Sequence, residues 1–172
     1  MNRSSRSSGR AGKARDSRAG KARDSRAGKA RDNRAGKLVD ASAVEAPSER
    51  SVVSSRAPRP VGPYPHARRF GDLLFLSGIG PRHRETDEIA EGIEAQTRAC
   101  IENVKAILED AGSSLEKVID VTVFLTDIDH DFAAFNRVYG DYFGAIAPAR
   151  TTVGIVALPT PISIELKVIA AS

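Results

Sequence analysis

The sequence predicts an α/β domain of the α+β kind, with the element order β-β-α-β-α-β-β, over roughly the last 110 of its 172 residues. Two observations support this prediction. Short segments rich in β-branched residues alternate with two stretches in which apolar residues recur every three or four positions. Because two helices cannot cover both faces of such a sheet, both are expected on one face. The uncovered face then needs a partner, and another subunit is the expected one.

The domain is expected to begin with a β-hairpin. Residues 62–70 (GPYPHARRF) form its short first strand and residues 73–80 (LLFLSGIG) its apolar second strand, joined by a Gly-Asp turn at 71–72. The motif GIG at 78–80 is similar to part of a dinucleotide-binding loop, but Pro81 follows and the third glycine is missing. A surface loop is therefore expected after the second strand.

An amphipathic helix is expected from about Ala90 to Ala111, because its apolar residues recur at three- and four-residue steps. Gly112 follows it in the manner of a C′ glycine. Cys100 lies on the apolar face and is expected to pack in the core, with a reactive thiol as the alternative. As the single cysteine, it excludes an intrachain disulfide and a cysteine-based zinc site in the monomer.

A strand and a second helix follow. Residues 118–126 (VIDVTVFLT) are rich in β-branched side chains, which favours a strand. Residues 127–131 carry acidic side chains at a helix start, where the helix dipole favours negative charge. The helix is expected over about 132–143, and most of its aromatic residues, which recur at helical spacing, must be core.

The last two strands contain the first candidate functional residues. They are expected at 151–158 (TTVGIVAL) and 162–170 (ISIELKVIA), with two prolines bracketing the turn between them. Arg150 directly precedes the first strand, and Glu165 stands in the middle of the second. An unpaired ionised carboxylate in a buried strand is destabilising, so Glu165 is paired, faces outward or is retained for chemistry.

The N-terminal part differs from the domain in composition. Residues 10–33 are three copies of an octad, RAGKARDS or RAGKARDN, and a truncated copy follows. Up to Pro58 there are 15 Lys and Arg against 6 Asp and Glu, a net charge of +9, whereas the remainder has 11 against 16, a net charge of −5. Residues 1–58 are therefore expected to be a disordered basic tail, and residues 59–172 the folded domain. An extension without a role is favoured over contact between the tail and nucleic acid.

Several kinds of protein and site are not expected. No stretch approaches 18 consecutive apolar residues, and the N-terminus lacks the apolar core of a secretory signal, so a cytoplasmic protein without a membrane partner is expected. His66, His83 and His130 are scattered without the spacing of metal ligands. There is no Walker loop and no Gly-x-Ser-x-Gly motif either. Neither a metal nor a cofactor is expected.

Seven segments occur in the order found in one known family. They are GPYPHA at 62–67, LLFLSG at 73–78, ENVKAILEDAG at 102–112, DVTVFLTD at 120–127, FNRVYGDYF at 135–143, PAR at 148–150 and IELKVIA at 164–170. Through them the chain resembles the Rid (YjgF-type) family of enamine/imine deaminases. The resemblance implies a chorismate-mutase-like fold and a homotrimer with active sites in the clefts between subunits. It also implies a small carboxylate-bearing enamine or imine as substrate, and no cofactor.

The resemblance assigns roles to single residues. Arg150 matches the arginine that grips the substrate carboxylate through a two-pronged hydrogen bond. Glu165 matches the acid that orients the attacking water. Further residues match positions that line the same cleft, namely Tyr64, Ser77, Gly78, Ile79 and Asn136.

Three residues depart from the common family pattern. Ile79 stands where glutamine is usual, Thr152 where cysteine often follows the PAR motif, and Lys167 where the second glutamate of IEIE is usual. With these departures the chain is similar to family members that deaminate 2-aminomuconate in the breakdown of aromatic compounds. That substrate is a dienamine with two carboxylates.

A second carboxylate would be helped by a second cation, and Arg82, Arg69 or His66 could supply one. Two other functions remain as alternatives. One is a general deaminase of 2-iminopropanoate and 2-iminobutanoate, and the other is a non-enzymatic binder of small carboxylates or of nucleic acid. Retention of both Arg150 and Glu165 argues against the binder, which would need only the arginine.

Overall fold

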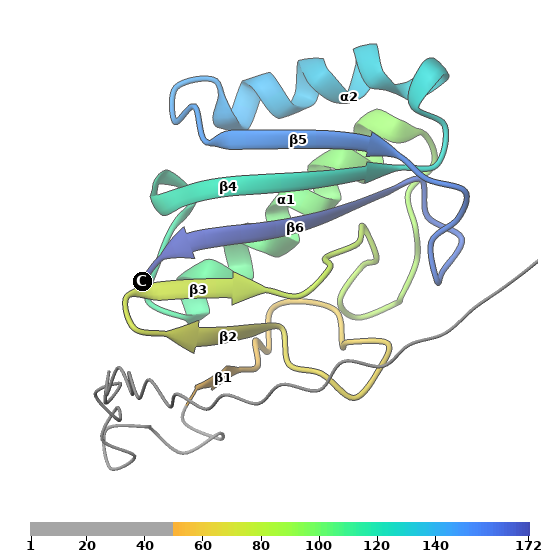
Figure 1. Cartoon of the computed structure of the whole chain (residues 1–172). Coiled ribbons are helices and arrows are strands. Elements are labelled where there is room, and N and C mark those ends of the chain that lie inside the picture. Colours follow the sequence, from red (N-terminus) through yellow and green to blue (C-terminus); the bar gives the residue numbers. More distant parts are fainter. Residues whose placement is uncertain (1–49) are drawn as a thin grey trace, which may run out of the picture. The chain divides into compact units, whose positions relative to one another are not determined.

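Residues 50–172, the part of the chain that the computed structural model describes, build a six-stranded sheet with the order β1-β2-β3-β6-β4-β5 (Figure 1). The strands are β1 Ser51–Val52, β2 Ala67–Phe70, β3 Leu73–Leu76, β4 Val118–Leu125, β5 Ala149–Gly154 and β6 Ile164–Ala171. The helices are α1 Ile93–Asp110 and α2 Ile128–Phe143, with a short 3-10 turn, η2, at Leu115–Lys117. β4 and β5 run parallel, and the other neighbouring strands run antiparallel.

Both helices lie on one face of the sheet, as the sequence predicts (Figure 1). The alternation of side chains along the central strands determines this face, because Ile164, Leu166 and Val168 of β6 are fully buried while the residues between them are more exposed. The apolar stripe of α1 belongs to the same core: Cys100, Ile101, Val104, Ile107 and Leu108. The α+β fold class and the position of the helices are therefore confirmed.

Cys100 is a core residue, as predicted. Its side chain is fully buried, and its thiol donates a weak hydrogen bond to the carbonyl oxygen of Ile79 at 3.4 Å. Burial raises the pKa of the Cys100 thiol well above its usual value. Since the thiolate is the reactive form, this position does not favour a nucleophile.

The predicted helices are present with shifted ends. α1 ends just before Gly112, whose φ of 78° lies in the left-handed region expected of a C′ glycine. α2 begins at Ile128, earlier than the expected start at about residue 132. The reason is a cap, because the Asp127 carboxylate accepts a hydrogen bond from the backbone N–H of His130 at 3.2 Å.

The two C-terminal strands are not neighbours in the sheet. β4 lies between β5 and β6, and α2 forms the crossover from β4 to the parallel strand β5. The segment Pro159-Thr160-Pro161 therefore connects two strands across the end of β4 instead of closing a hairpin. As a consequence, a whole strand separates Arg150 on β5 from Glu165 on β6.

The fold begins before the expected domain start at Arg59. β1 pairs with β2, and the Ser54 hydroxyl donates a hydrogen bond to the Asp110 carboxylate at 2.6 Å. Arg56 makes an ion pair with the same carboxylate at 2.7 Å. Residues 53–61, here called the N-terminal strap, are thus part of the domain, and the expected boundary is too late. The octad repeats lie outside the described residues.

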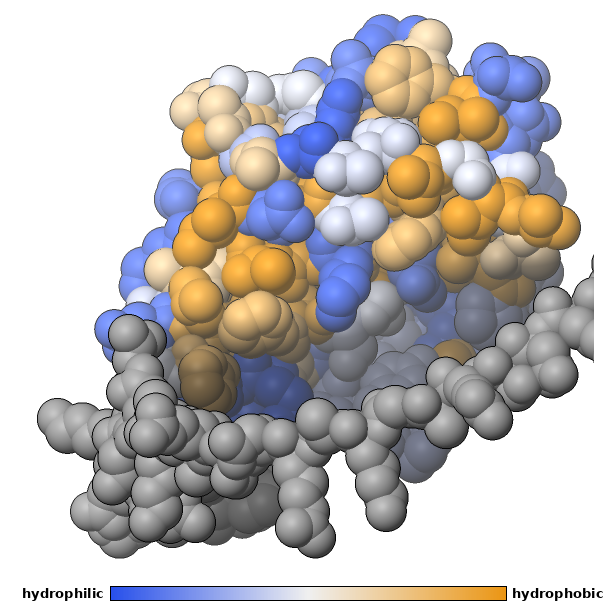
Figure 2. All heavy atoms as spheres, in the orientation of Figure 1, coloured by the Kyte–Doolittle hydropathy of each residue, from blue (hydrophilic) through white to orange (hydrophobic). Residues whose placement is uncertain are grey.

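No helix of residues 50–172 covers the face of the sheet opposite α1 and α2, and apolar side chains gather on it (Figure 2). We call it the open face. Its residues are Phe75, Thr122, Phe124, Thr151, Val153, Glu165, Lys167 and Ile169. Phe75 is 36% exposed, which is high for so large an apolar ring. Exposed apolar patches commonly mark interaction surfaces, and the subunit expected here stays a prediction.

Two kinds of feature are absent from residues 50–172. None of the helices there is long and apolar enough to cross a bilayer. No group of three or more His, Cys, Asp or Glu side chains in that range could hold a metal ion.

Candidate functional site

A pocket forms where the N-terminal strap meets the end of β3, the loop before β6 and the start of β6. Seven of the nine predicted site residues line it: Tyr64, His66, Ser77, Gly78, Ile79, Arg82 and Glu165. We call it the Glu165 pocket. The other two predicted residues, Asn136 and Arg150, do not line it.

Backbone pairing brings the end of β3 against Glu165. The N–H of Ile79 donates to the carbonyl of Leu166 at 2.8 Å, and the N–H of Leu166 donates back to the carbonyl of Ile79 at 3.0 Å. Gly78 consequently lies directly against the Glu165 carboxylate. A Cβ atom at Gly78 would overlap that carboxylate, so only glycine leaves it room.

The Glu165 side chain is half-buried and makes no hydrogen bond or ion pair with residues 50–172. Burial raises the pKa of this carboxyl above its ordinary value, and the positive charge of Lys167 opposes part of that rise. An acid of this kind, poorly solvated and without a protein partner, is typical of a functional position.

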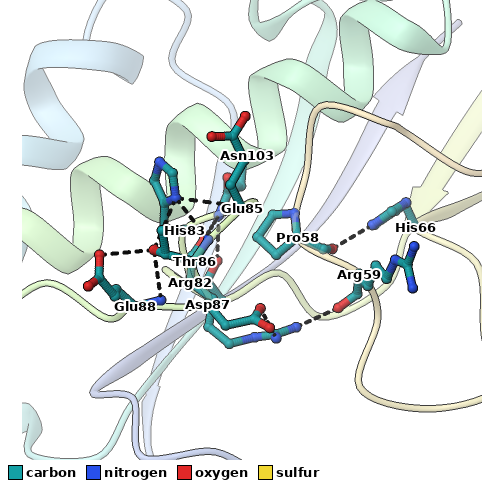
Figure 3. Close-up of polar contacts among 11 residues, drawn as sticks. Pro58, Arg59, His66, Arg82, His83, Glu85, Thr86, Asp87, Glu88 and Asn103 are labelled. Carbon is teal, nitrogen blue, oxygen red and sulfur yellow. Dashed lines mark hydrogen bonds and ion pairs between the residues drawn. The ribbon is translucent and has the colours of Figure 1, made fainter.

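Ser77 and His66 hold the N-terminal strap onto the sheet. The Ser77 hydroxyl donates to the carbonyl of Pro65 at 2.7 Å. His66 is 3% exposed, its Nδ1 accepts from the N–H of Ser54 at 2.9 Å, and its Nε2 donates to the carbonyl of Pro58 at 2.8 Å (Figure 3). Both ring nitrogens are therefore occupied by backbone, and His66 has none left for a substrate carboxylate.

The other two predicted cations are also engaged. Arg82 donates to the Asp87 carboxylate at 2.6 Å and to the carbonyl oxygen of Arg59 at 2.5 Å (Figure 3). Its side chain is only 19% exposed. Arg69 donates to the carbonyl oxygen of Ala111 at 2.7 Å, at the end of α1. Within the described residues, these two arginines therefore bond to loop and helix-end groups.

Arg150 lies at a separate place, on the helix face of the edge strand β5. Its Nη1 donates to Oδ1 of Asn136 on α2 at 2.8 Å, and its guanidinium carbon lies 4.6 Å from the ring centre of Tyr139. We call these three residues the Arg150 platform. The hydroxyls of Tyr139 and of Thr152 are buried without a hydrogen-bond partner in the described part of the chain. This end of the sheet therefore has polar groups that a ligand or a second chain could satisfy.

Register explains why one chain does not bring Arg150 and Glu165 together. Arg150 pairs with Val121 of β4, whereas Glu165 pairs with Phe124, three residues further along and on the opposite face. The two residues lie two strands apart across the sheet and three residues apart along the strands. Their Cα atoms are therefore about 14 Å apart. Within one chain the two residues therefore lie apart, on opposite faces of the sheet.

The family described as endoribonuclease L-PSP matches residues 54–172. A RutC family protein of Pyrococcus abyssi is 47% identical over 120 residues, which cover 69% of this chain and 94% of that protein. The chain belongs to this family. It is the Rid or YjgF family that the sequence resembles, and the match also includes residues 54–58 of the N-terminal strap.

TdcF of Escherichia coli is another member that is similar to this Rid-family chain. It is described as a candidate reactive intermediate deaminase and is 38% identical over 125 residues, which cover 71% of this chain and 96% of TdcF. The crystal structure of TdcF with bound serine matches the fold with a TM-score of 0.67 at 37% identity, covering 71% of this chain and 98% of that one. The family and its fold, expected from the sequence, are confirmed.

Sequence reasoning missed two residues of this Rid-type site. Tyr139 was assigned to the core stripe of the second helix, and its ring also supports Arg150. Arg59 is the first residue of the expected domain and has no role in the sequence prediction, yet it lines the Glu165 pocket. The available signal was the sequence Pro58-Arg59-Pro60, since two prolines fix the backbone on either side of an arginine.

Proposed function

We propose that the protein is a cofactor-independent Rid-type deaminase that hydrolyses a carboxylate-bearing enamine or imine, with 2-aminomuconate as its substrate. The main support is Glu165, an unpaired and poorly solvated carboxylate in a pocket with an exposed rim. The proposed chemistry uses acid-base and electrostatic groups.

In the proposed reaction the enamine first tautomerises to the imine. Glu165 accepts a proton from a water as the water oxygen bonds to the imine carbon, and it passes this proton to the imine nitrogen. The tetrahedral carbinolamine then loses ammonia: the hydroxyl proton is transferred through Glu165 to the nitrogen, the C–N bond breaks and the C=O bond forms. Imine and water are thus converted to a keto acid and ammonia, with no electron transfer. Because the Glu165 carboxylate has no partner among the described residues, no hydrogen bond or ion pair has to break before it accepts the proton.

Arg150 of a second copy would hold the substrate carboxylate. The guanidinium fork binds a carboxylate through two parallel hydrogen bonds, and Asn136 and the Tyr139 ring keep the fork in place. Since Arg150 and Glu165 are separated within one chain, a complete site requires contact between different surfaces of two subunits. Such a heterologous contact closes into a ring, and a homotrimer is the ring that we propose. The apolar open face supports burial against another subunit.

Two comparisons support the substrate class. TdcF, whose structure holds serine, shows that a relative accommodates a small molecule with a carboxylate and an amino group. The candidate role of TdcF as a reactive intermediate deaminase supports the reaction class. The narrower substrate, 2-aminomuconate, is supported by Ile79, Thr152 and Lys167, which depart from the pattern common in the family.

Ammonia release from 2-aminomuconate and from 2-iminopropanoate, generated in place and measured side by side, tests this proposal. A higher kcat/KM for 2-aminomuconate is expected. Equal values, or a preference for 2-iminopropanoate, would contradict the specific substrate while retaining the deaminase. No ammonia above the uncatalysed rate from either compound would contradict both.

Action on RNA, which the family description suggests, has less support. The domain from Arg59 onward has 11 Lys and Arg against 16 Asp and Glu, a net charge of −5. A polyanion is repelled by such a surface, because proteins bind phosphate backbones chiefly through Lys and Arg.

A further inference from the structure

A dicarboxylate substrate raises an electrostatic problem in the Glu165 pocket. Its first carboxylate is assigned above to Arg150 of a second copy, so the inference below rests on the proposed function. Its second carboxylate enters a half-buried site that already contains the Glu165 carboxyl. Two like charges in such a place are unfavourable unless a cation lies near the second one. The pocket must therefore supply that cation.

Three side chains that line the pocket could carry positive charge: Arg59, His66 and Arg82. His66 uses both ring nitrogens on the backbone of the strap. Arg82 is held by the Asp87 carboxylate and by the carbonyl of Arg59. Lys167, on the open face, donates to the carbonyl of Leu76 at 3.2 Å and does not line the pocket. Arg59 remains.

Arg59 combines a fixed backbone with an available side chain. Its carbonyl oxygen accepts the hydrogen bond from Arg82, and Pro58 is fixed in turn by His66 (Figure 3). Pro60 follows, so prolines restrict the backbone on both sides. The Arg59 guanidinium is exposed and has no hydrogen bond or ion pair with any residue of the described range 50–172. In Figure 3 its side chain leaves the strap on the side away from the Arg82–Asp87 pair.

From these observations we infer that Arg59 determines specificity by binding the second carboxylate of a dicarboxylate enamine or imine. The residues that hold its backbone are pocket residues themselves, so the backbone of Arg59 needs little ordering on binding and only its side chain must be fixed. His66 and Arg82 then position Arg59 instead of contacting the ligand. A substrate with one carboxylate does not use Arg59.

The test is binding of two unreactive six-carbon keto acids to the full-length protein by calorimetry. 2-Oxoadipate has two carboxylates, and 2-oxohexanoate has one. Arg59→Gln removes the charge but keeps the backbone carbonyl that Arg82 binds. It should weaken 2-oxoadipate binding about tenfold or more and leave 2-oxohexanoate binding unchanged. Arg59→Lys should restore part of the difference, because the charge returns without the planar fork.

Arg84→Gln is the matched control. Arg84 lies in the neighbouring loop, pairs with Glu85 at 2.7 Å and does not line the Glu165 pocket. It should change neither affinity. The inference is wrong if Arg59→Gln weakens both ligands equally or neither, or if Arg84→Gln reproduces its effect. Binding is measured without turnover. A loss of affinity for 2-oxoadipate alone therefore supports the role of Arg59 even if the protein releases no ammonia from either proposed substrate. In that case only the proposed reaction is wrong.

Discussion

Glu165 and Arg150 are carried by the same sheet in opposite surroundings. Glu165 is half-buried, has no hydrogen-bond partner among the described residues and has its pKa raised by burial. Arg150 is exposed on an edge strand, and it is held by Asn136 at 2.8 Å and by the Tyr139 ring. The surroundings of Glu165 destabilise its charged carboxylate. Those of Arg150 leave the guanidinium solvated but fix its orientation.

Under the proposed function, this difference suits the two residues to different roles. A carboxylate that accepts a proton benefits from poor solvation, because its basicity rises toward neutral pH. A guanidinium that binds a carboxylate benefits from orientation, because its charge never titrates. In that proposal neither residue is sufficient alone, since Glu165 lacks the binding cation and Arg150 lacks the base.

The largest expected effect is that of Glu165→Gln. Loss of the proton acceptor should lower kcat by about 10²- to 10⁴-fold with little change in ligand affinity. The same variant should raise the melting temperature at pH 7. The pKa of Glu165 is higher in the folded state, so stability falls as the pH rises above the unfolded pKa, and the neutral amide removes that fall. Steady-state ammonia release and thermal melts measure both effects.

Glu91→Gln is the control for that variant, because Glu91 is exposed and outside the pocket. The acid limb of the wild-type pH–activity profile should lie above the ordinary pKa of a glutamate, since burial raises the pKa of Glu165 and catalysis needs its carboxylate form. Normal turnover by Glu165→Gln would mean that the water is activated by another group.

The second effect concerns the space beside the carboxylate. Gly78→Ala places a methyl group where the Glu165 carboxylate lies. A displacement of about 1 Å is expected to lower kcat by roughly 10²-fold. Gly140→Ala is the control, because nothing lies within 4 Å of its Cβ position on α2. That change should leave activity intact and stabilise the helix by about 0.5–1 kcal/mol. Equal activity of Gly78→Ala and wild type would show that the carboxylate position is not critical.

The third effect tests whether the Arg150 and the Glu165 of one site come from the same chain or from two chains. Arg150→Ala and Glu165→Gln should each be nearly inactive alone. Co-expression in equal amounts should restore about one quarter of wild-type activity, because one site in four then combines an intact Glu165 with an intact Arg150 from another subunit. No restoration, with mixed oligomers verified by mass spectrometry, would mean that both residues act from the same chain.

Much of the fold could be predicted from local patterns. The stripe on α1, its terminal Gly112 and the turn at Gly71 are encoded by neighbouring residues. β1 is only two residues long, too short for periodicity to reveal. The placement of β4 between β5 and β6 depends on long-range pairing, and proline-bracketed turns do not specify it.

The site could be predicted only through the family resemblance. The spacing alone favours an outward strand residue beside Lys167 for Glu165, and its raised pKa depends on burial in the folded chain. The sequence also could not show that backbone carbonyls occupy Arg82 and His66, because those carbonyls come from distant segments. Arg59 was overlooked because it borders a segment rich in Arg and Lys, whose composition distinguishes no single arginine.

The smallest expected effect concerns the strap that forms one wall of the Glu165 pocket. Ser54→Ala removes the hydroxyl that donates to Asp110 at 2.6 Å and accepts from the N–H of Arg56 at 3.0 Å. It should lower the free energy of unfolding by about 1 kcal/mol at pH 7, whereas Ser55→Ala, on an exposed neighbour, should change it by less than about 0.5 kcal/mol. Denaturant titrations measure both.

The pH dependence of this loss gives its cause. The hydrogen bond from Ser54, followed by that from Arg56, lowers the pKa of Asp110 below its usual 3.8. A depressed folded pKa contributes stability above the unfolded pKa and loses it as the pH falls through the folded value. The difference between wild type and Ser54→Ala should therefore be full at pH 7 and shrink below about pH 4. A difference independent of pH would mean that Ser54 acts through packing alone, and that the charge of Asp110 does not hold the strap over Glu165.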